Sequence, residues 1–183
     1  MRTICAILCL VTSLCIAAPG ESSLVFNDLN DVPHHPLDPA DKLGSVLFFF
    51  WQDCPISNGY VPEINRLYAA HTNFAFYIVQ VDPELTLAGA KEHAHKFDLH
   101  PHVLLDPQQR LVKLTGATVT PEAVVLGKSG TVLYRGRIDN LYASLGKKRS
   151  AATKHDLLDA LDNIAAGKAV KQKETKAIGC SIQ

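Results

Sequence analysis

The feature that most constrains the fold is an uninterrupted apolar run that ends at a cysteine-proline pair. Residues 45–51 read SVLFFFW, an uncharged run typical of a strand that is buried on both faces. Cys54 and Pro55 follow after two polar residues, and a helix-like pattern over 58–71 comes next. Proline at the first position of a helix loses no hydrogen bond, because the N–H that it lacks has no partner there. The sequence therefore predicts a buried strand leading into a helix, with Cys54 at the junction.

Strand-like and helix-like segments alternate along the rest of the chain. Strand-helix-strand order favours parallel pairing, whereas the last two strands lie close together around GKSG and favour an antiparallel hairpin. The expected fold class is therefore α/β, with a central mixed β-sheet flanked by helices. The predicted strands are 45–51, 74–82, 102–106, 123–126 and 131–138, and the predicted helices are 58–71, 85–97, 108–114 and 153–166.

Length and charge narrow the class of protein. With 183 residues and 47% hydrophobic content, the chain is long enough for one well-packed domain and short for two. Lysine plus arginine and aspartate plus glutamate both number 18, so the formal net charge is zero. A neutral chain lacks the basic surface that binds nucleic acids or anionic membranes. We therefore expect no nucleic-acid partner.

The first residues have the pattern of a secretory signal peptide. An early arginine precedes an uncharged apolar stretch over 4–18, which ends in small residues suited to cleavage. The stretch is shorter than the roughly 20 residues that a transmembrane helix needs. We expect residues 1–18 to be removed and the mature protein to be secreted or periplasmic, without a membrane span; retention by an uncleaved segment is the alternative. Of five cysteines, only Cys54 and Cys180 would remain.

The expected domain organisation places the second cysteine in a tail. Residues 22–167 would form the folded domain, and the lysine-rich segment 168–183 would be a flexible C-terminal tail. Cys180 lies in this tail directly after Gly179, which gives the backbone freedom. A mobile tail could carry Cys180 to Cys54 within one chain or across a dimer. The alternative is an incidental cysteine in the tail.

Cys54 is the candidate nucleophile. At a helix N-terminus, free backbone N–H groups and the positive end of the helix dipole stabilise a thiolate, which lowers a cysteine pKa from its usual value of about 8.5. The neighbouring Asp53 acts in the opposite direction. The alternative interpretation is an inert cysteine that fills a tight strand end as a small hydrophobic residue.

A proline motif later in the chain supports the reactive interpretation. Thr120 and Pro121 directly precede the apolar strand predicted at 123–126. Because proline has no N–H to donate within a sheet, it belongs at a strand start or in a cis turn. A cis-proline loop of this kind would stand opposite Cys54 in a thioredoxin-like architecture.

The order and spacing of these motifs resemble the thioredoxin-like superfamily from about Leu24 to Gly167. The narrower resemblance is to exported redoxin-domain proteins of the alkyl hydroperoxide reductase/thiol-specific antioxidant type. The motifs that carry it are CPISNGYVPEINRLY from residue 54, LLDPQQRLVKLTGATVTPEAVVL from residue 104, YRGRID from residue 134, and the late GC at 179–180.

The resemblance implies a thiol-based oxidoreductase that exchanges disulfides or reduces peroxides. It implies Cys54 as the catalytic cysteine and Cys180 as the candidate resolving cysteine. The expected partners are a protein with a thiol or disulfide, or a small peroxide, together with an external reductant, and no cofactor is expected. The substrate-binding residues that it implies are Trp51, Pro55, Thr120 and Pro121.

Two positions depart from the patterns of these families. Ser57 stands where thioredoxins have the second cysteine of Cys-x-x-Cys, which excludes a local dithiol cycle. Peroxiredoxins carry threonine or serine three residues before the reactive cysteine, whereas this chain has Trp51, so the hydroxyl that orients a peroxide is missing. A lone thiolate needs a resolving thiol in each cycle, and the candidates are Cys180 or an outside thiol.

Two other classes of function stay open. In the first, the domain is a non-enzymatic module that binds a partner in the groove between Cys54 and the Thr120–Pro121 loop. In the second, it carries copper or haem-linked cargo through Cys54 and histidines, as a copper chaperone does.

The histidines of EHAHKFDLHPH, residues 92–102, are the basis of the metal-carrier alternative. His93 and His95 would point to different faces of a helix, so they do not readily bind one ion. His100 and His102 could share a face if that stretch is extended. We expect solvated surface histidines here and no metal site.

Overall fold

The computed structural model describes residues 24–183. The expected signal peptide at residues 1–18 lies outside the described residues and stays a prediction. No helix in the described part of the chain is long and apolar enough to cross a membrane. The elements in chain order are β1 (Phe26–Asn27), β2 (Pro33–His34), β3 (Ser45–Phe50), α1 (Pro55–Ala70), β4 (Ala75–Gln80), α2 (Leu87–Lys96), β5 (His102–Leu105), α3 (Arg110–Thr115), β6 (Val119–Thr120), β7 (Glu122–Leu126), the 3₁₀ turn η2 (Lys128–Gly130), β8 (Val132–Gly136), β9 (Tyr142–Ser144), β10 (Lys147–Lys148), α4 (Asp156–Ala165) and β11 (Cys180–Ser181).

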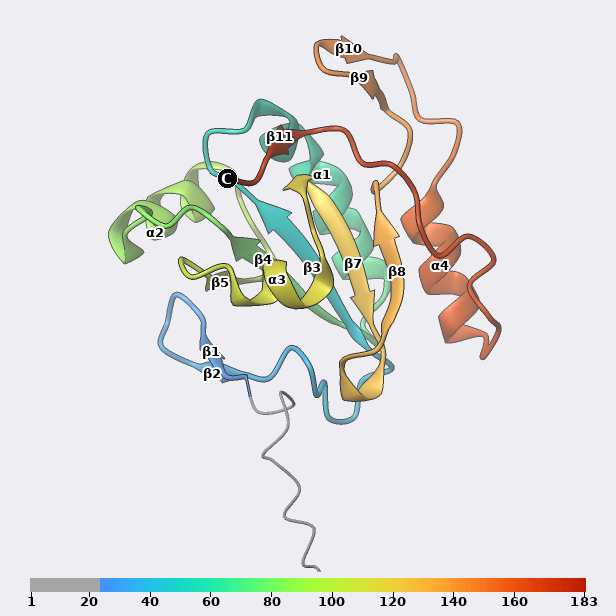
Figure 1. The fold of residues 1–183 in the computed structure, drawn as a ribbon, viewed down its shortest axis with the longest axis horizontal. Coiled ribbons are helices and arrows are strands. Elements are labelled where there is room, and N and C mark those ends of the chain that lie inside the picture. The colour runs from blue at the N-terminus through green and yellow to red at the C-terminus, as the bar shows by residue number, and fades with distance from the viewer. Residues whose placement is uncertain (1–23) are drawn as a thin grey trace, which may run out of the picture.

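A five-stranded sheet with the strand order β5-β4-β3-β7-β8 lies at the centre of the structure (Figure 1). Strands β3, β4 and β5 are parallel, whereas β7 and β8 form an antiparallel hairpin beside β3. All six residues of β3 are buried, as expected for a strand with both faces covered. The central mixed sheet flanked by helices, which the sequence predicted, is confirmed.

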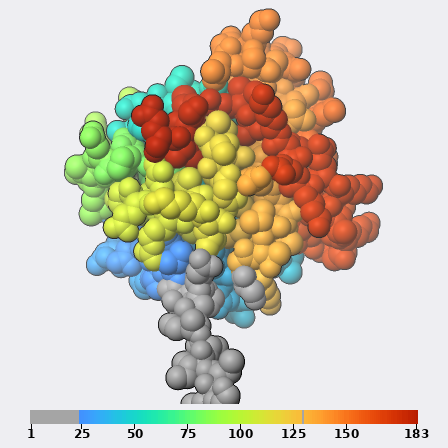
Figure 2. All heavy atoms as spheres, in the orientation of Figure 1, coloured from blue at the N-terminus to red at the C-terminus, as the bar shows by residue number. Residues whose placement is uncertain are grey.

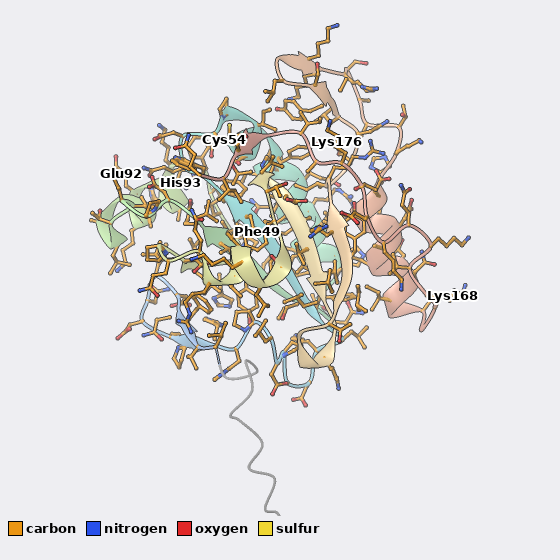
Figure 3. All side chains as sticks on the ribbon, viewed as in Figure 1. Phe49, Cys54, Glu92, His93, Lys168 and Lys176 are labelled. Carbon is orange, nitrogen blue, oxygen red and sulfur yellow. The ribbon has the colours of Figure 1, made fainter. Side chains whose placement is uncertain are left out.

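Alternating side chains of β3 contribute to two hydrophobic layers. Phe48 and Phe50 pack in the layer that contains side chains of α1 and α4. Leu47 and Phe49 pack in the layer that contains side chains of α3, and Figure 3 labels Phe49 near the middle of the sheet. Successive residues of a strand face opposite sides, so one apolar run serves both layers. Each fully buried phenylalanine stabilises the fold by about 1.5–3 kcal/mol.

Helix α4 begins at Asp156, three residues later than the predicted start at 153. The reason is a loop contact, because the Asn140 side-chain oxygen accepts hydrogen bonds from the backbone N–H groups of Thr153 and Lys154, at 2.8 and 3.0 Å. These bonds hold both residues in an extended loop that leads into the helix.

The C-terminal segment 168–183 differs from the flexible tail that the sequence predicted. It runs along the body of the domain, and Figure 2 shows it lying across the surface in dark red. The Thr175 backbone N–H donates to the Arg135 carbonyl at 3.0 Å, and the Ile182 N–H donates to the Thr118 carbonyl at 3.0 Å. Between them, β11 pairs with β6. Backbone hydrogen bonds therefore hold this segment, and composition alone does not show such bonds.

A buried tyrosine hydroxyl links α1 to the loop after β8. The Tyr60 hydroxyl donates to a carboxylate oxygen of Asp139 at 2.7 Å, and both residues are buried. We expect Tyr60→Phe to lower the free energy of unfolding by about 1.5–3 kcal/mol, because a hydrogen bond to a charged group is lost. Urea denaturation measures the change. Tyr68→Phe is the matched control, since the Tyr68 hydroxyl, on the same helix, has no hydrogen-bond partner among residues 24–183. Equal stability of the two variants would contradict the prediction.

Candidate active site

Cys54 lies at the N-cap of α1, at the end of the central strand. After β3 ends at Phe50, the chain turns, and the Cys54 N–H donates to the Trp51 carbonyl at 3.0 Å. Cys54 has extended backbone angles, φ −79° and ψ 112°, and Pro55 occupies the first helical position. The strand-to-helix junction predicted from the sequence is confirmed. It places the thiol at the positive end of a 16-residue helix, where a thiolate is stabilised.

The Thr120–Pro121 loop stands directly against Cys54. The peptide bond between the two residues is cis, as the sequence suggested. The Cys54 thiol donates a hydrogen bond to the Thr120 carbonyl oxygen at 3.1 Å. Both Cys54 and Thr120 are almost fully buried, with exposed fractions of 1% and 0%.

Cys180 reaches the same place from the C-terminal segment. Strand β11 pairs antiparallel with β6, which puts Cys180 opposite Thr120 and Ser181 opposite Val119. The Thr120 hydroxyl also donates to the Cys180 carbonyl, at 3.4 Å. The two cysteines therefore meet at Thr120, Cys180 packs against the hydrophobic layer that contains Cys54, and both are free thiols.

The two thiols differ in acidity. Burial raises the pKa of Cys54, but hydrogen bonds from the Cys180 thiol and from Ser57 to the sulfur outweigh it, so the pKa lies below the usual value. For Cys180, burial and the hydrogen bond to Cys54 both raise the pKa, to about 11. Cys54 is therefore the more acidic thiol of the pair.

Ser57 is positioned to stabilise a thiolate at Cys54. It lies in the first turn of α1, and its buried hydroxyl has no hydrogen-bond partner among residues 24–183. A buried hydroxyl without a partner is costly, and a thiolate at Cys54 would satisfy it. The serine that replaces the second cysteine of the dithiol motif thus supports ionisation of Cys54.

The remaining predicted residues, Pro55, Pro121 and Trp51, lie next to the two cysteines or to the loop against them. Pro55 begins the helix and Pro121 begins the turn into β7, so both shape the backbone on either side of the sulfur. Trp51 is half-buried and packs against both hydrophobic layers at the end of β3. The structure therefore brings Cys54, Cys180 and the Thr120–Pro121 loop together. Trp51 lies beside Cys54, since its carbonyl accepts the backbone hydrogen bond from the Cys54 N–H.

Two further residues, Gly179 and Glu122, position the site, in roles that the sequence did not show. A Cβ on Gly179 would overlap the Thr120 carbonyl group, so only glycine lets β11 approach the loop this closely. The Glu122 carboxylate accepts hydrogen bonds from the backbone N–H groups of Thr118 and Val119, at 2.7 and 3.4 Å, which holds β6 in place. The available signals were the glycine directly before Cys180 and the acidic residue directly after Pro121.

His93 is buried near the active site, which corrects the expectation of a solvated surface histidine. Its ring hydrogen-bonds to the Asn58 side chain at 2.8 Å and to the Gln80 side chain at 3.1 Å. Asn58 in turn donates to the Gln52 carbonyl at 2.8 Å, in the turn before Cys54. Figure 3 shows His93 and Cys54 on the same side of the molecule. Burial lowers the pKa of His93. The ring supports the turn before Cys54 through its hydrogen bond to Asn58.

Ser57→Ala is expected to raise the pKa of Cys54, because it removes a hydroxyl that donates to the thiolate. Titration of the thiolate absorbance in the ultraviolet measures the midpoint, which should move to higher pH. Ser45→Ala is the matched control, since the Ser45 hydroxyl is also buried without a partner within residues 24–183, but lies at the far end of β3. An unchanged midpoint in Ser57→Ala would mean that Ser57 does not act on the sulfur.

Solved structures share this fold at low sequence identity. A hypothetical protein from Sinorhizobium meliloti 1021 has a TM-score of 0.70 at 23% identity, covering 87% of this chain and 89% of that chain. A secreted Mycobacterium tuberculosis disulfide oxidoreductase homologous to E. coli DsbE has a TM-score of 0.55 at 18% identity, covering 81% and 99%. The thioredoxin domain of a Bacteroides vulgatus thiol-disulfide oxidoreductase has a TM-score of 0.54 at 14% identity, covering 66% and 88%.

The chain therefore has a thioredoxin-like fold. No family model and no curated protein sequence matches it. At these identities the likeness defines the fold alone. The narrower resemblance to redoxin-domain proteins of the thiol-specific antioxidant type stays a prediction.

Proposed function

We propose that the protein is a thiol-disulfide oxidoreductase in which Cys54 is the nucleophile and Cys180 is the resolving thiol. The observation that carries the proposal is that the two cysteines meet at Thr120, whose carbonyl accepts from Cys54 and which is the β-ladder partner of Cys180. At this place the pKa of Cys54 is lowered and that of Cys180 is raised. Only a thiolate attacks a disulfide, so this ordering assigns the first attack to Cys54. Solved structures with this fold include a disulfide oxidoreductase and a thiol-disulfide oxidoreductase, which supports thiol-based redox chemistry in general.

The reaction with a partner disulfide takes two exchange steps. The Cys54 thiolate attacks one sulfur of the partner, forms a mixed disulfide, and releases the other partner sulfur as a thiolate. Cys180 then loses its proton to that thiolate and attacks the Cys54 sulfur, which releases the second partner thiol. The partner is reduced to two thiols, and the protein is oxidised to a Cys54–Cys180 disulfide. An external thiol reductant restores both cysteines.

The burial of Cys54 also supports a small oxidant as an alternative substrate. Only 1% of Cys54 is exposed, beneath the strand that carries Cys180. A small peroxide needs less space than a protein disulfide. The thiolate would attack one peroxide oxygen, which yields a sulfenic acid and releases an alcohol or water, and Cys180 would condense with the sulfenic acid and release water. Trp51 supplies no hydroxyl to orient a peroxide, so we rank disulfide exchange first.

Export is part of the proposal. The apolar stretch over 4–18 supports a cleaved signal peptide and a secreted or periplasmic location. In such a compartment a two-cysteine protein meets disulfide partners. The C-terminal cysteine would replace the missing second cysteine at position 57 as the resolving thiol.

Mass spectrometry of the mature chain tests the proposal. The protein is treated with one equivalent of a small disulfide or of hydrogen peroxide, then alkylated and mapped by peptide mass. We expect rapid, reversible formation of a Cys54–Cys180 disulfide, and the faster of the two oxidants identifies the substrate class. Cys54→Ser is expected to leave Cys180 reduced over the same time, because burial still raises the pKa of Cys180 when Cys54 is absent.

The same measurement has an outcome that contradicts the proposal. If both thiols alkylate slowly and neither oxidant links them, catalysis by Cys54 is excluded. The non-enzymatic binding module then becomes the better description of the protein.

A further inference from the structure

Three side chains far apart in the sequence meet at the edge of the sheet, away from the thiol pair. Asp28 follows β1, His34 ends β2, and His102 begins β5. The backbone of Asp28 bridges to Leu104 of β5, which brings the β1–β2 hairpin against the sheet edge. Figure 1 shows this hairpin in blue beside β5.

The ligand-type atoms of these side chains face one another at short range. One Asp28 carboxylate oxygen lies 3.1 Å from His34 Nε2 and 3.1 Å from His102 Nδ1. All three atoms lie within 4.8 Å of one another. Zinc binds imidazole nitrogen and carboxylate oxygen at about 2.0–2.2 Å in a tetrahedron, which places neighbouring ligand atoms about 3.3 Å apart. The observed spacing is therefore close to that of a zinc-binding triad.

The carboxylate of Asp28 is held in a fixed orientation. Its other oxygen accepts hydrogen bonds from the backbone N–H groups of Asn30 and Val32, at 2.8 and 3.1 Å. Burial raises the pKa of Asp28, but hydrogen bonds from His34, from these N–H groups and from His102 outweigh it and lower the pKa to about 2. Outer contacts of this kind orient metal ligands in proteins.

A cavity gives an ion access to the two histidines of the triad and leaves room for a fourth ligand. It has a volume of about 560 Å³, and its lining includes His34 and His102. His35 and Asp38 line the same cavity and add further groups of metal-ligand type. A site with three protein ligands and an open position is the arrangement of a zinc site that also binds water or a small ligand.

We propose that Asp28, His34 and His102 form a binding site for a divalent transition-metal ion of the zinc type. The ion would join the β1–β2 hairpin to β5 through one ligand on each side of the hairpin and one on the sheet edge. The prediction of no metal site was based on the histidines over 92–102 and did not include Asp28, which lies 74 residues before His102. The proposal is independent of the redox activity proposed for the thiols.

Zinc titration by calorimetry tests the site in the full mature chain, produced without a histidine tag. Because thiols also bind zinc, the background carries Cys54→Ser and Cys180→Ser. We expect one zinc ion to bind and the melting temperature to rise when zinc is added. His102→Gln is expected to lower the zinc affinity by more than about 10-fold, the loss expected even for an outer-shell partner. Its side chain is 52% exposed, so the substitution should leave the fold intact.

His100→Gln is the matched control. Its side chain is 49% exposed, lies two residues from His102 and contacts Asp98 instead of Asp28. We expect this variant to bind zinc as tightly as the background and to show the same rise in melting temperature. His34→Gln should weaken binding as His102→Gln does.

Three results would overturn the proposal. The first is the absence of zinc binding in the cysteine-free background. The second is equal zinc affinity of the His102→Gln and His100→Gln variants. The third is zinc binding that appears only when the thiols are present. In each case the triad would be a hydrogen-bonded cluster that holds the hairpin through Asp28 alone.

Discussion

Cys180→Ser is expected to slow turnover sharply while the first attack still occurs, so that the partner protein accumulates on Cys54 as a mixed disulfide. Strand β11 brings Cys180 to Thr120, against which Cys54 lies, and a positioned internal group reacts far faster than one in free solution. When only about millimolar external thiol is left to resolve the intermediate, the rate of disulfide reduction falls on the order of 100-fold or more. Steady-state kinetics with a protein disulfide measures the rate, and a non-reducing gel shows the trapped complex.

Two variants complete this experiment. Ser181→Ala changes the next, exposed residue of β11 and should keep the full rate. The double variant with Cys54→Ser and Cys180→Ser should show neither turnover nor a trapped complex. If Cys180→Ser turns over at the rate of the unchanged protein, an outside thiol resolves the intermediate and Cys180 is not the resolver.

Gly179→Ala is expected to loosen β11 from the Thr120–Pro121 loop and to expose Cys54. The added Cβ would overlap the carbonyl group of Thr120, which is backbone and cannot turn aside as a flexible side chain can. Overpacking of this kind typically costs about 1–3 kcal/mol, which corresponds to roughly a 5- to 150-fold larger population with β11 detached. Alkylation of Cys54 should accelerate by a similar factor, and formation of the Cys54–Cys180 disulfide should slow.

Lys176→Ala is the control for this effect. Lys176 lies in the same C-terminal segment, its side chain is exposed, and Figure 3 labels it on that segment. Its removal should change neither the alkylation of Cys54 nor disulfide formation. Unchanged alkylation in Gly179→Ala would mean that β11 does not limit access to the sulfur.

The two predictions examine opposite roles of one strand. Strand β11 brings Cys180 to the Thr120–Pro121 loop, against which Cys54 lies with an exposed fraction of 1%, and we expect the same strand to limit access to Cys54. A large partner must therefore displace β11 before it reaches the nucleophile, whereas a small oxidant need not. Gly179→Ala should accordingly favour attack on protein disulfides and slow their resolution.

The strand-to-helix junction could be predicted because its information is local. An apolar run with no charge requires two covered faces, and a Cys-Pro pair before an amphipathic pattern places the cysteine at a helix start. Both expectations agree with β3 and with Cys54 as the N-cap of α1. The turn at Thr120–Pro121 could be predicted for the same reason, because it depends on the backbone N–H that proline itself lacks.

The histidines were harder to predict because their environment depends on residues distant in sequence. His93 was expected to be solvated, but α2 turns it toward Asn58 of α1 and Gln80 of β4, where it is buried. Helical periodicity shows which residues share a face, but it does not show what packs against that face. The same limit applies to His102, whose partner Asp28 lies 74 residues earlier.

By itself, the sequence determined the α/β class, the position of Cys54 at a helix N-terminus, and the proline turn before β7. Each depends on backbone geometry within a few neighbouring residues. Only the tertiary structure decided where residues 168–183 run and that Cys180 meets Cys54. Their place depends on backbone hydrogen bonds from β11 to β6 and on the missing side chain of Gly179, and neither leaves a periodic pattern in the chain. The segment is polar and lysine-rich, so its composition predicts no docking, yet its few apolar side chains, among them Val170 and Ile182, pack against the two hydrophobic layers beside the backbone hydrogen bonds.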